Sequence, residues 1–212
     1  MLNKQLNNYS VMGFATFQKK RDVETMDVIA ASLDWQREFL KSMDGIGFHC
    51  LLGNMSGGFA DIIFATDRPS FDKMGELHFE APSSIKFMSL LDPESIQLRS
   101  ASILKEGLII PSGFSCIEAG FMTLAEGAIA EDEEVRLGSD KIEEQYLGGY
   151  SNTLGHFVGR AEDQSYCEIT FGQTLGQTRE ICYGYEHSVI CQDFLNQFDE
   201  KKFEFDFWVP LA

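Results

Sequence analysis

Hydrophobic and polar residues alternate in several short stretches of the chain, a pattern that is typical of β-strands. In the first half of the sequence it predicts strands over 11–17, 47–52, 59–66 and 95–104. Apolar residues spaced three and four apart predict a long helix over 23–43 and shorter helices after Asp67 and over 84–91. The resulting order, β-α-β-β-α-β, is that of a ferredoxin-like fold.

The second half of the chain repeats the first at a constant shift of 107 residues, which carries His49 onto His156. It predicts a second set of strands over 116–124, 153–160, 165–173 and 203–209. An acidic loop at 131–134 and a short helix over 140–147 replace the long first helix, and a last helix covers 186–198. One shift that matches several segments indicates a duplicated domain.

The repeat predicts two similar lobes, 1–106 and 107–212, each of a size that buries a modest core. Side chains alternate across a strand, so each predicted strand has two faces. We expect the wholly apolar set to be covered by the helices; it includes Gly13, Ala15, Phe17, Ala60, Ile62, Phe64, Cys167, Ile169 and Phe171. The opposite, mixed set contains the residues of the predicted site: Phe14, Thr16, His49, Asp61, Arg99, Phe121, Thr123, His156, Arg160, Glu168 and Trp208.

This pattern of elements resembles the dimeric α+β barrel superfamily. In that group two ferredoxin-like sheets pack face to face, and the barrel interior holds the ligand or active site. The resemblance implies an α+β fold class in which two βαββαβ lobes form the barrel within one chain. The group includes quinol-forming monooxygenases, haem-binding enzymes and isomerases, and also proteins of no known activity.

Two histidine–carboxylate pairs are the sharpest candidates for chemistry. His49 precedes Asp61 by twelve residues across a predicted hairpin, and His156 precedes Glu168 by the same interval. An odd-length hairpin loop places each pair on one face of the sheet. A carboxylate that orients an imidazole is a recurrent acid–base arrangement, and a purely structural cross-strand pair is the competing interpretation.

Cofactor motifs are absent from the sequence. No short-spaced HExxH, GxGxxG or GxSxG motif is present, so we predict neither a metal nor a cofactor. His78 and His187, which do not align at the shift of 107, leave haem binding as a third possibility. Further aromatic candidates for a pocket wall or for packing are Trp35, Tyr183 and Tyr185.

Net charge and composition limit the classes of molecule that the protein is expected to bind. The 212 residues carry a net charge of −16, of which residues 1–106 contribute −3 and residues 107–212 contribute −13. Such a surface repels phosphate backbones and anionic bilayers, so we expect neither nucleic acid nor a membrane as a partner. The five cysteines form no CxxC pair and the N-terminus lacks a signal-peptide pattern, which favours the cytoplasm.

The sequence thus predicts binding or conversion of a small, apolar or aromatic molecule inside an α+β barrel, of a monooxygenase or isomerase type. The paired residues would act as the acid–base groups, and the chain would be a monomer or a homodimer. The alternative is a ligand-binding or interaction module without catalysis. The sequence does not decide whether the protein is an enzyme.

Overall fold

The computed structural model describes residues 1–4, 6, 8–128, 130–161 and 165–212. The chain divides into two compact units, Met1–Ser100 with Pro210–Ala212, and Ala101–Val209. We call these units lobe 1 and lobe 2. The predicted domains at 1–106 and 107–212 remain a proposal about the origin of the chain.

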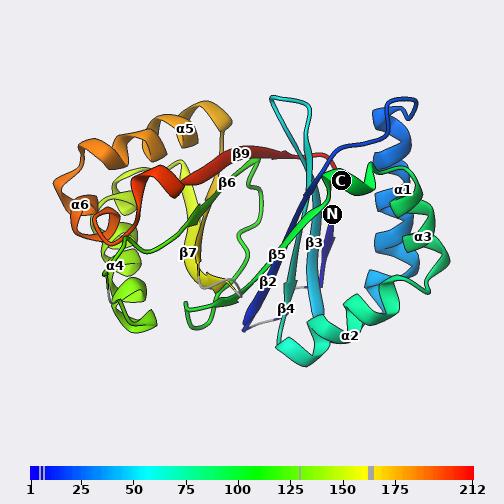
Figure 1. The fold of residues 1–212 in the computed structure, drawn as a ribbon, viewed down its shortest axis with the longest axis horizontal. Coiled ribbons are helices and arrows are strands. Elements are labelled where there is room, and N and C mark those ends of the chain that lie inside the picture. The colour runs from blue at the N-terminus through cyan, green and yellow to red at the C-terminus, as the bar shows by residue number, and fades with distance from the viewer. Residues whose placement is uncertain (5, 7, 129, 162–164) are drawn as a thin grey trace. The chain divides into compact units, whose positions relative to one another are not determined.

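Lobe 1 has the ferredoxin-like order of elements. These are β1 (Leu2–Asn3), β2 (Val11–Phe17), α1 (Thr25–Glu38), β3 (Ile46–Asn54), β4 (Phe59–Ala65), α2 (Arg68–His78), α3 (Pro82–Ser89) and β5 (Gln97–Ile103). The strands hydrogen-bond in the order β1-β3-β4-β2-β5. Helices α1, α2 and α3 cover one face of this sheet (Figure 1).

Local signals explain where these elements begin and turn. The Asp67 side chain accepts a hydrogen bond of 2.8 Å from the backbone N–H of Ser70, which caps α2. In the β3–β4 hairpin, Gly57 adopts a φ of 84°, which favours glycine. The predicted helix over 23–43 is longer than α1, because the chain leaves the α-helix after Glu38 and forms a 3₁₀ turn at Leu40–Ser42.

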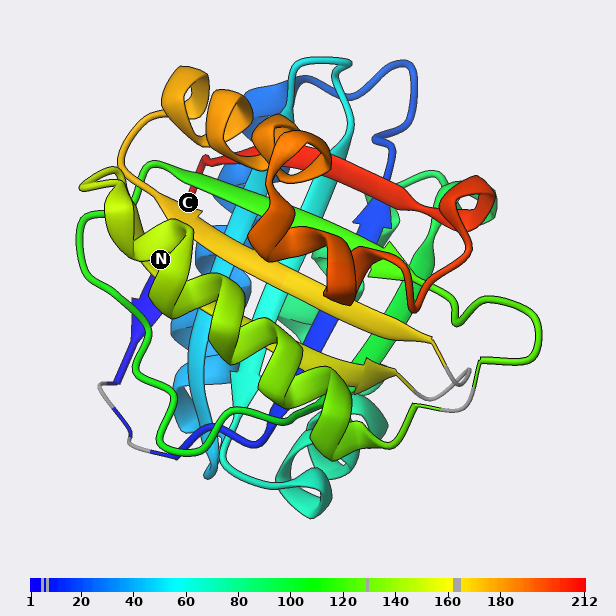
Figure 2. The same cartoon turned by 90° about the vertical axis from the view of Figure 1, so that its left-hand side faces the viewer.

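Lobe 2 repeats the order of lobe 1. Its elements are β6 (Cys116–Met122), α4 (Asp132–Gln145), β7 (Thr153–Ala161), β8 (Tyr166–Gly172), α5 (Leu175–Tyr183), α6 (Val189–Leu195) and β9 (Glu204–Pro210). The strands hydrogen-bond in the order β7-β8-β6-β9, and residues 101–103 of β5 pair with β7. Helices α4, α5 and α6 lie over one face of the sheet (Figure 2).

The prediction of a short first helix in lobe 2 was wrong. Helix α4 is a 14-residue helix like α1, and its bounds lie 107 residues after those of α1. Glu131 and Glu134 form a capping box, so the acidic run begins the helix, where its charge also favours the helix dipole. Farther along, Arg136 binds Asp140 one turn away. The helix predicted over 186–198 corresponds only to α6, and α5 was missed.

Each lobe has its own apolar core between sheet and helices. In lobe 1, the indole of Trp35 stacks on the ring of Phe87 at a centroid distance of 5.3 Å. In lobe 2, the core includes Ile142 of α4, Tyr166 of β8 and Phe194 of α6. Burial of these large side chains against the sheets is the main driving force for folding of each lobe.

The face prediction was right for β2 and wrong for β4 and β8. Residues directly opposite in an antiparallel pair share a face, and the register pairs Ala15 with Asp61. Ala15 faces the helices as predicted, so Asp61 does too, whereas Ala60 and Ile62 point to the opposite face. In lobe 2, Gly120 pairs with Glu168 and gives the same arrangement. Every residue of β4 and β8 is buried, so polarity alone does not identify the helix side.

Candidate functional site

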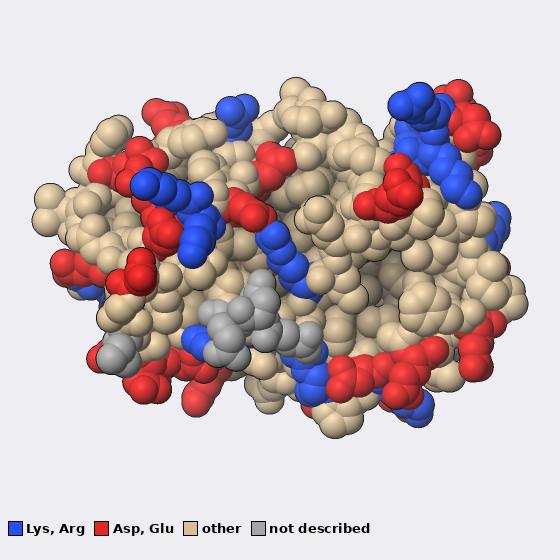
Figure 3. Space-filling model, viewed as in Figure 1, with Lys and Arg blue, Asp and Glu red and all other residues tan. Residues whose placement is uncertain are grey.

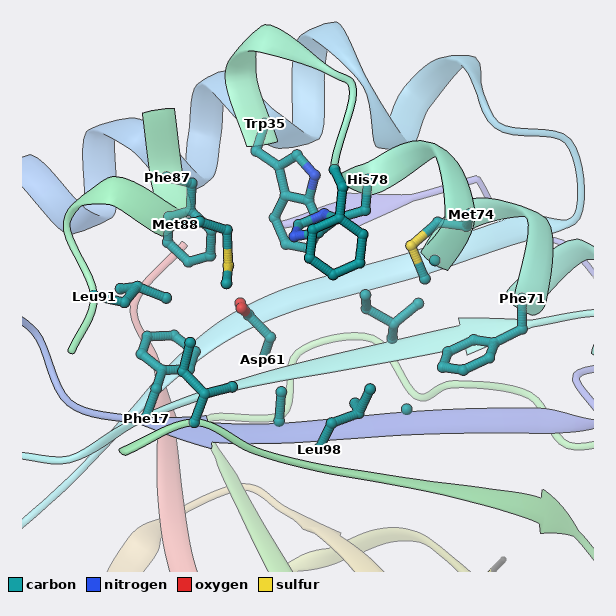
Figure 4. A pocket seen from close by; sticks show the side chains of 16 residues that line it. Phe17, Trp35, Asp61, Phe71, Met74, His78, Phe87, Met88, Leu91 and Leu98 are labelled. Atoms are coloured by element: carbon teal, nitrogen blue, oxygen red, sulfur yellow. The ribbon is translucent and has the colours of Figure 1, made fainter. Parts of the chain in front are cut away.

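A cavity of about 210 Å³ lies between the sheet and the helices of lobe 1 (Figure 4). Gly13 and Ala15 of β2 form part of its floor, and their small side chains leave the space open. Its walls and mouth come from residues of all three helices and of β5, including Trp35, Phe71, Met74, His78, Phe87 and Leu98. The lining is apolar apart from a few nitrogen and oxygen atoms, which are therefore the candidates for chemistry.

Asp61 provides the only carboxylate among the described residues that line this pocket. The side chain stands on β4, is only 5% exposed, and points toward Trp35 and His78 (Figure 4). Its Oδ1 accepts a hydrogen bond of 2.8 Å from Nε2 of His49, which is fully buried on β3. The hairpin register makes the two residues diagonal neighbours, since Asp61 is opposite Leu51. The bond to Oδ1 leaves Oδ2 for a ligand.

Three buried nitrogen atoms surround this carboxylate without a hydrogen-bond partner in the described part of the chain. They are Nδ1 of His49, Nδ1 of His78 and Nε1 of Trp35. The indole of Trp35 contacts both imidazoles edge to face, at centroid distances of 4.9 and 5.2 Å. A buried polar atom without a partner costs about 1–3 kcal/mol, and two of these three belong to residues that line the cavity, Trp35 and His78, so these two are the candidates to bind a ligand.

The surroundings of His78 favour its neutral form. Burial lowers the pKa of its imidazole, and the negative charge of Asp61 opposes this effect only in part. A neutral imidazole has one nitrogen that donates and one that accepts, so it can bind a polar group of either kind. His78 is the last residue of α2, which fixes its ring at the pocket wall.

Lobe 2 has a smaller pocket in the equivalent place. It measures about 70 Å³, and Glu168 and Glu118 contribute carboxylates to its lining. At positions 107 residues apart, larger side chains replace smaller ones: Met122 for Ala15, Cys182 for Gly75 and Tyr185 for His78. These substitutions account for the difference in volume, so lobe 1 offers the roomier site.

The second histidine–carboxylate pair, in lobe 2, has more charged neighbours than the pair in lobe 1. Nε2 of His156 binds Oε1 of Glu168 at 2.6 Å, and its Nδ1 lies 3.8 Å from Oε2 of Glu143 on α4. Lys105 in turn pairs with Glu143. Burial alone would lower the pKa of His156, but the two carboxylates outweigh burial and raise it to about 9. Lobe 1 has Gln36 at the position of Glu143.

The remaining predicted residues lie elsewhere. Because side chains alternate along a strand, five of them point to the sheet face away from the helices. These are Phe14, Thr16 and Arg99 of lobe 1, and Phe121 and Trp208 of lobe 2. Thr123 directly follows β6. Arg160 lies on the helix side, where it donates to Oδ1 of Asp132 at 3.2 Å and to the Tyr166 hydroxyl. None of these joins Asp61 in the lining of the pocket.

Sequence reasoning missed most of the pocket wall. Trp35 was a candidate for a pocket wall and His78 for haem binding, but Phe71, Met74 and Phe87 gave no signal beyond that of core residues. Such a signal does not exist in a single sequence, because an apolar residue beside a cavity obeys the same periodicity as one in a filled core. The cavity results from the small residues opposite, Ala15 and Gly75.

The donor atoms do not suit a metal or a haem. No group of three or more His, Cys, Asp or Glu side chains among the described residues could hold a metal ion. His78 could supply an axial nitrogen to haem iron. However, no Lys or Arg among the described residues lines the lobe 1 pocket to meet the propionates of a haem. A buried carboxylate faces the space, and about 210 Å³ is small for a tetrapyrrole.

No protein-family model and no curated protein matches the chain. Solved structures do match. A protein of Lactobacillus acidophilus, named provisionally as a monooxygenase, has a TM-score of 0.65 at 6% identity over 96% of this chain and 94% of its own. A haem-binding protein of Thermus thermophilus has a TM-score of 0.63 at 9% identity, over 100% of this chain and 95% of its own. A variant chlorite dismutase of Candidatus Nitrospira defluvii has a TM-score of 0.62 at 10% identity, over 96% of this chain and 92% of its own.

These structures share the α+β barrel fold. The chain has that fold. The predicted fold class is therefore confirmed, and so is the resemblance to the dimeric α+β barrel superfamily as a likeness of fold. Fold alone does not transfer function, because many unrelated activities use one fold. No helix in the described residues has the length and apolar character needed to cross a bilayer.

Proposed function

We propose that lobe 1 binds a compact, mainly apolar aromatic molecule and that Asp61 removes a proton from it as a general base. The observation that carries this proposal is the buried carboxylate of Asp61 on the floor of an otherwise apolar cavity, hydrogen-bonded to His49. A desolvated carboxylate next to a cavity is the arrangement that general-base catalysis requires.

The roles of the residues follow from their positions. His49 donates through Nε2–H to Oδ1 of Asp61, so it fixes the carboxylate and stabilises its charge. Oδ2 then accepts a proton from a C–H group or a phenolic O–H group of the bound molecule. The nitrogen atoms of Trp35 and His78 can hydrogen-bond an oxygen of the substrate. In an isomerase the resulting anion regains a proton at another atom, and in a cofactor-independent monooxygenase it reacts with dioxygen.

The size of the pocket supports a small substrate. An engineered cavity of about 150 Å³ binds benzene, whereas pockets for drug-sized ligands span about 300–1,000 Å³. A cavity of about 210 Å³ therefore suits one or two aromatic rings. The edges of Phe71, Phe87 and Trp35 offer a surface for such rings. A naphthol has the required size, an acidic hydroxyl and an apolar body.

The test is turnover of a panel of naphthols and naphthalenediols by the wild type and by Asp61→Asn. The asparagine keeps the shape of the side chain but cannot accept the proton, so we expect turnover to fall by about 10²–10⁴-fold, the usual contribution of a general base. Binding, measured by calorimetry, should change much less. Full turnover by Asp61→Asn would contradict the proposal.

Binding without chemical change over long incubation would favour the second candidate, a ligand-binding module without catalysis. The unpartnered atoms of Trp35 and His78 support that candidate equally, since they recognise a ligand without acting on it. We retain three further expectations as proposals: a duplicated origin, a monomer or homodimer, and the cytoplasm. All five cysteines are free, which agrees with a reducing compartment.

A further inference from the structure

The pocket of lobe 2 combines aromatic rings with carboxylates. Its lining includes Glu118, Glu168 and Glu186 together with the rings of Tyr183, Tyr185 and Phe205, and no Lys, Arg or His among the described residues. This composition differs from that of the lobe 1 pocket, whose single acid stands among apolar side chains. The chemistry of the two sites therefore differs as well.

The inner end of this pocket holds two buried carboxyl groups and a buried hydroxyl. Glu118 on β6 and Glu168 on β8 are each 6% exposed, and Glu168 is paired with His156. Burial and the charge of Glu168 raise the pKa of Glu118 well above its ordinary value. The hydroxyl of Tyr185 is buried in the described structure without a hydrogen-bond partner. A positively charged donor would satisfy all three side chains.

The mouth of the pocket is aromatic and already attracts a cation. The rings of Tyr183 and Phe205 are about half exposed and meet edge to face, with centroids 5.6 Å apart. The guanidinium of Arg179 lies 5.8 Å from the Tyr183 ring and 5.6 Å from the Phe207 ring. These distances are those of cation–π contacts, so the aromatic cluster at this mouth already attracts one positive group.

The net charge of the second half of the chain also favours the binding of a cation. Residues 107–212 carry six Lys and Arg against 19 Asp and Glu, a net charge of −13. On the face shown in Figure 3, acidic side chains are spread more widely than basic ones. A strongly negative field raises the local concentration of cations and lowers that of anions.

We propose that the lobe 2 pocket binds a small organic cation of the alkylammonium type. The ammonium group would donate to the carboxylates of Glu118 and Glu168 and to the hydroxyl of Tyr185, and the alkyl group would lie against the rings of Tyr183 and Phe205. A volume of about 70 Å³ limits the ligand to a few heavy atoms. This proposal is independent of the function proposed for lobe 1.

The experiment is a titration of the isotopically labelled full chain with ethylammonium chloride, followed by NMR, with ethanol as the neutral probe of similar size. The limit on binding energy per atom gives a Kd on the order of 1 mM for so small a cation. Saturable shifts at Gly120, Tyr183 and Phe205 with ethylammonium, and none with ethanol, are expected. No saturable shift at these residues, or an equal response to ethanol, would overturn the proposal.

Variants separate this site from a general attraction of cations. Glu168→Gln and Glu118→Gln should each weaken ethylammonium binding at least tenfold, and Phe205→Leu, at the exposed rim where folding is not at risk, at least threefold. Glu200→Gln removes an exposed charge from the same lobe without lining the pocket, so it should bind as the wild type does. Equal losses in Glu200→Gln and Glu168→Gln would show charge attraction alone and reject the site.

Discussion

At the scale of single residues, Asp61 and His156 show two ways of burying a charge. Desolvation of an ion costs several kcal/mol, and the protein must offset it locally. His156 has two carboxylate neighbours, Glu168 and Glu143, whose negative charges offset its positive charge. Asp61 has one hydrogen bond, from His49, and otherwise faces an apolar cavity. The less satisfied group, Asp61, is the better candidate for chemistry.

The charge of His156 should make stability depend on pH. Its folded pKa of about 9 exceeds its unfolded value of 6.5, so its contribution is complete below pH 6.5 and is lost as pH rises through 9. The difference corresponds to roughly 3 kcal/mol. We expect urea unfolding of the wild type to show lower stability at pH 9 than at pH 6.5.

The variant Glu143→Gln tests whether the charge of His156 causes this dependence of stability on pH. It copies the Gln36 of lobe 1 and removes one of the charges that raise the pKa of His156, so the loss of stability should begin at a lower pH. Glu144→Gln, on the exposed neighbouring residue, serves as the control and should follow the wild-type curve. Equal stability of the wild type at pH 6.5 and pH 9 would show that His156 does not carry the proposed charge.

At the scale of elements, the sequence was informative about type and order and less so about bounds and faces. The 107-residue shift anticipated the matching positions of β3 with β7 and of β4 with β8. The first half of helix α4 was missed because its acidic first turn has the composition of a loop, and only capping by Glu131 and Glu134 reveals its start. The faces of β4 were exchanged because both are buried, so one residue of offset is invisible in the pattern.

Gly75 connects the stability of α2 with the openness of the lobe 1 pocket. A glycine inside a helix is less favourable than a good helix former by about 1 kcal/mol, and a Cβ added here would meet no atom within 4 Å. We expect Gly75→Leu to stabilise the protein by roughly 0.5–1 kcal/mol and to fill the cavity, so that naphthol affinity falls at least tenfold. Chemical denaturation and calorimetry measure the two effects.

Gly176 of α5 offers a matched control, since a Cβ there is also unobstructed. Gly176→Leu should leave naphthol binding in lobe 1 unchanged. If Gly75→Leu bound naphthol as tightly as the wild type, the cavity beside α2 could not be the binding site.

At the scale of the whole molecule, the two lobes have different pockets. The lobe 1 pocket is larger and apolar, with one acid, and the lobe 2 pocket is smaller, acidic and aromatic. The charge is divided in the same way, −3 for residues 1–106 and −13 for residues 107–212. Repeated elements with diverged pocket residues suit a protein that binds two classes of small molecule, a neutral aromatic one and a cationic one.

The most direct test of the central claim is to map the shifts that 2-naphthol causes in the NMR spectrum of the labelled chain. We expect them to concentrate on the backbone amides of Gly13, Ala15 and Gly75, which line the lobe 1 pocket. Asp61→Asn should preserve this map, because it alters the base and not the cavity. Shifts at Phe14, Thr16 and Arg99, on the opposite face of the sheet, or no saturable shift in lobe 1, would contradict the account.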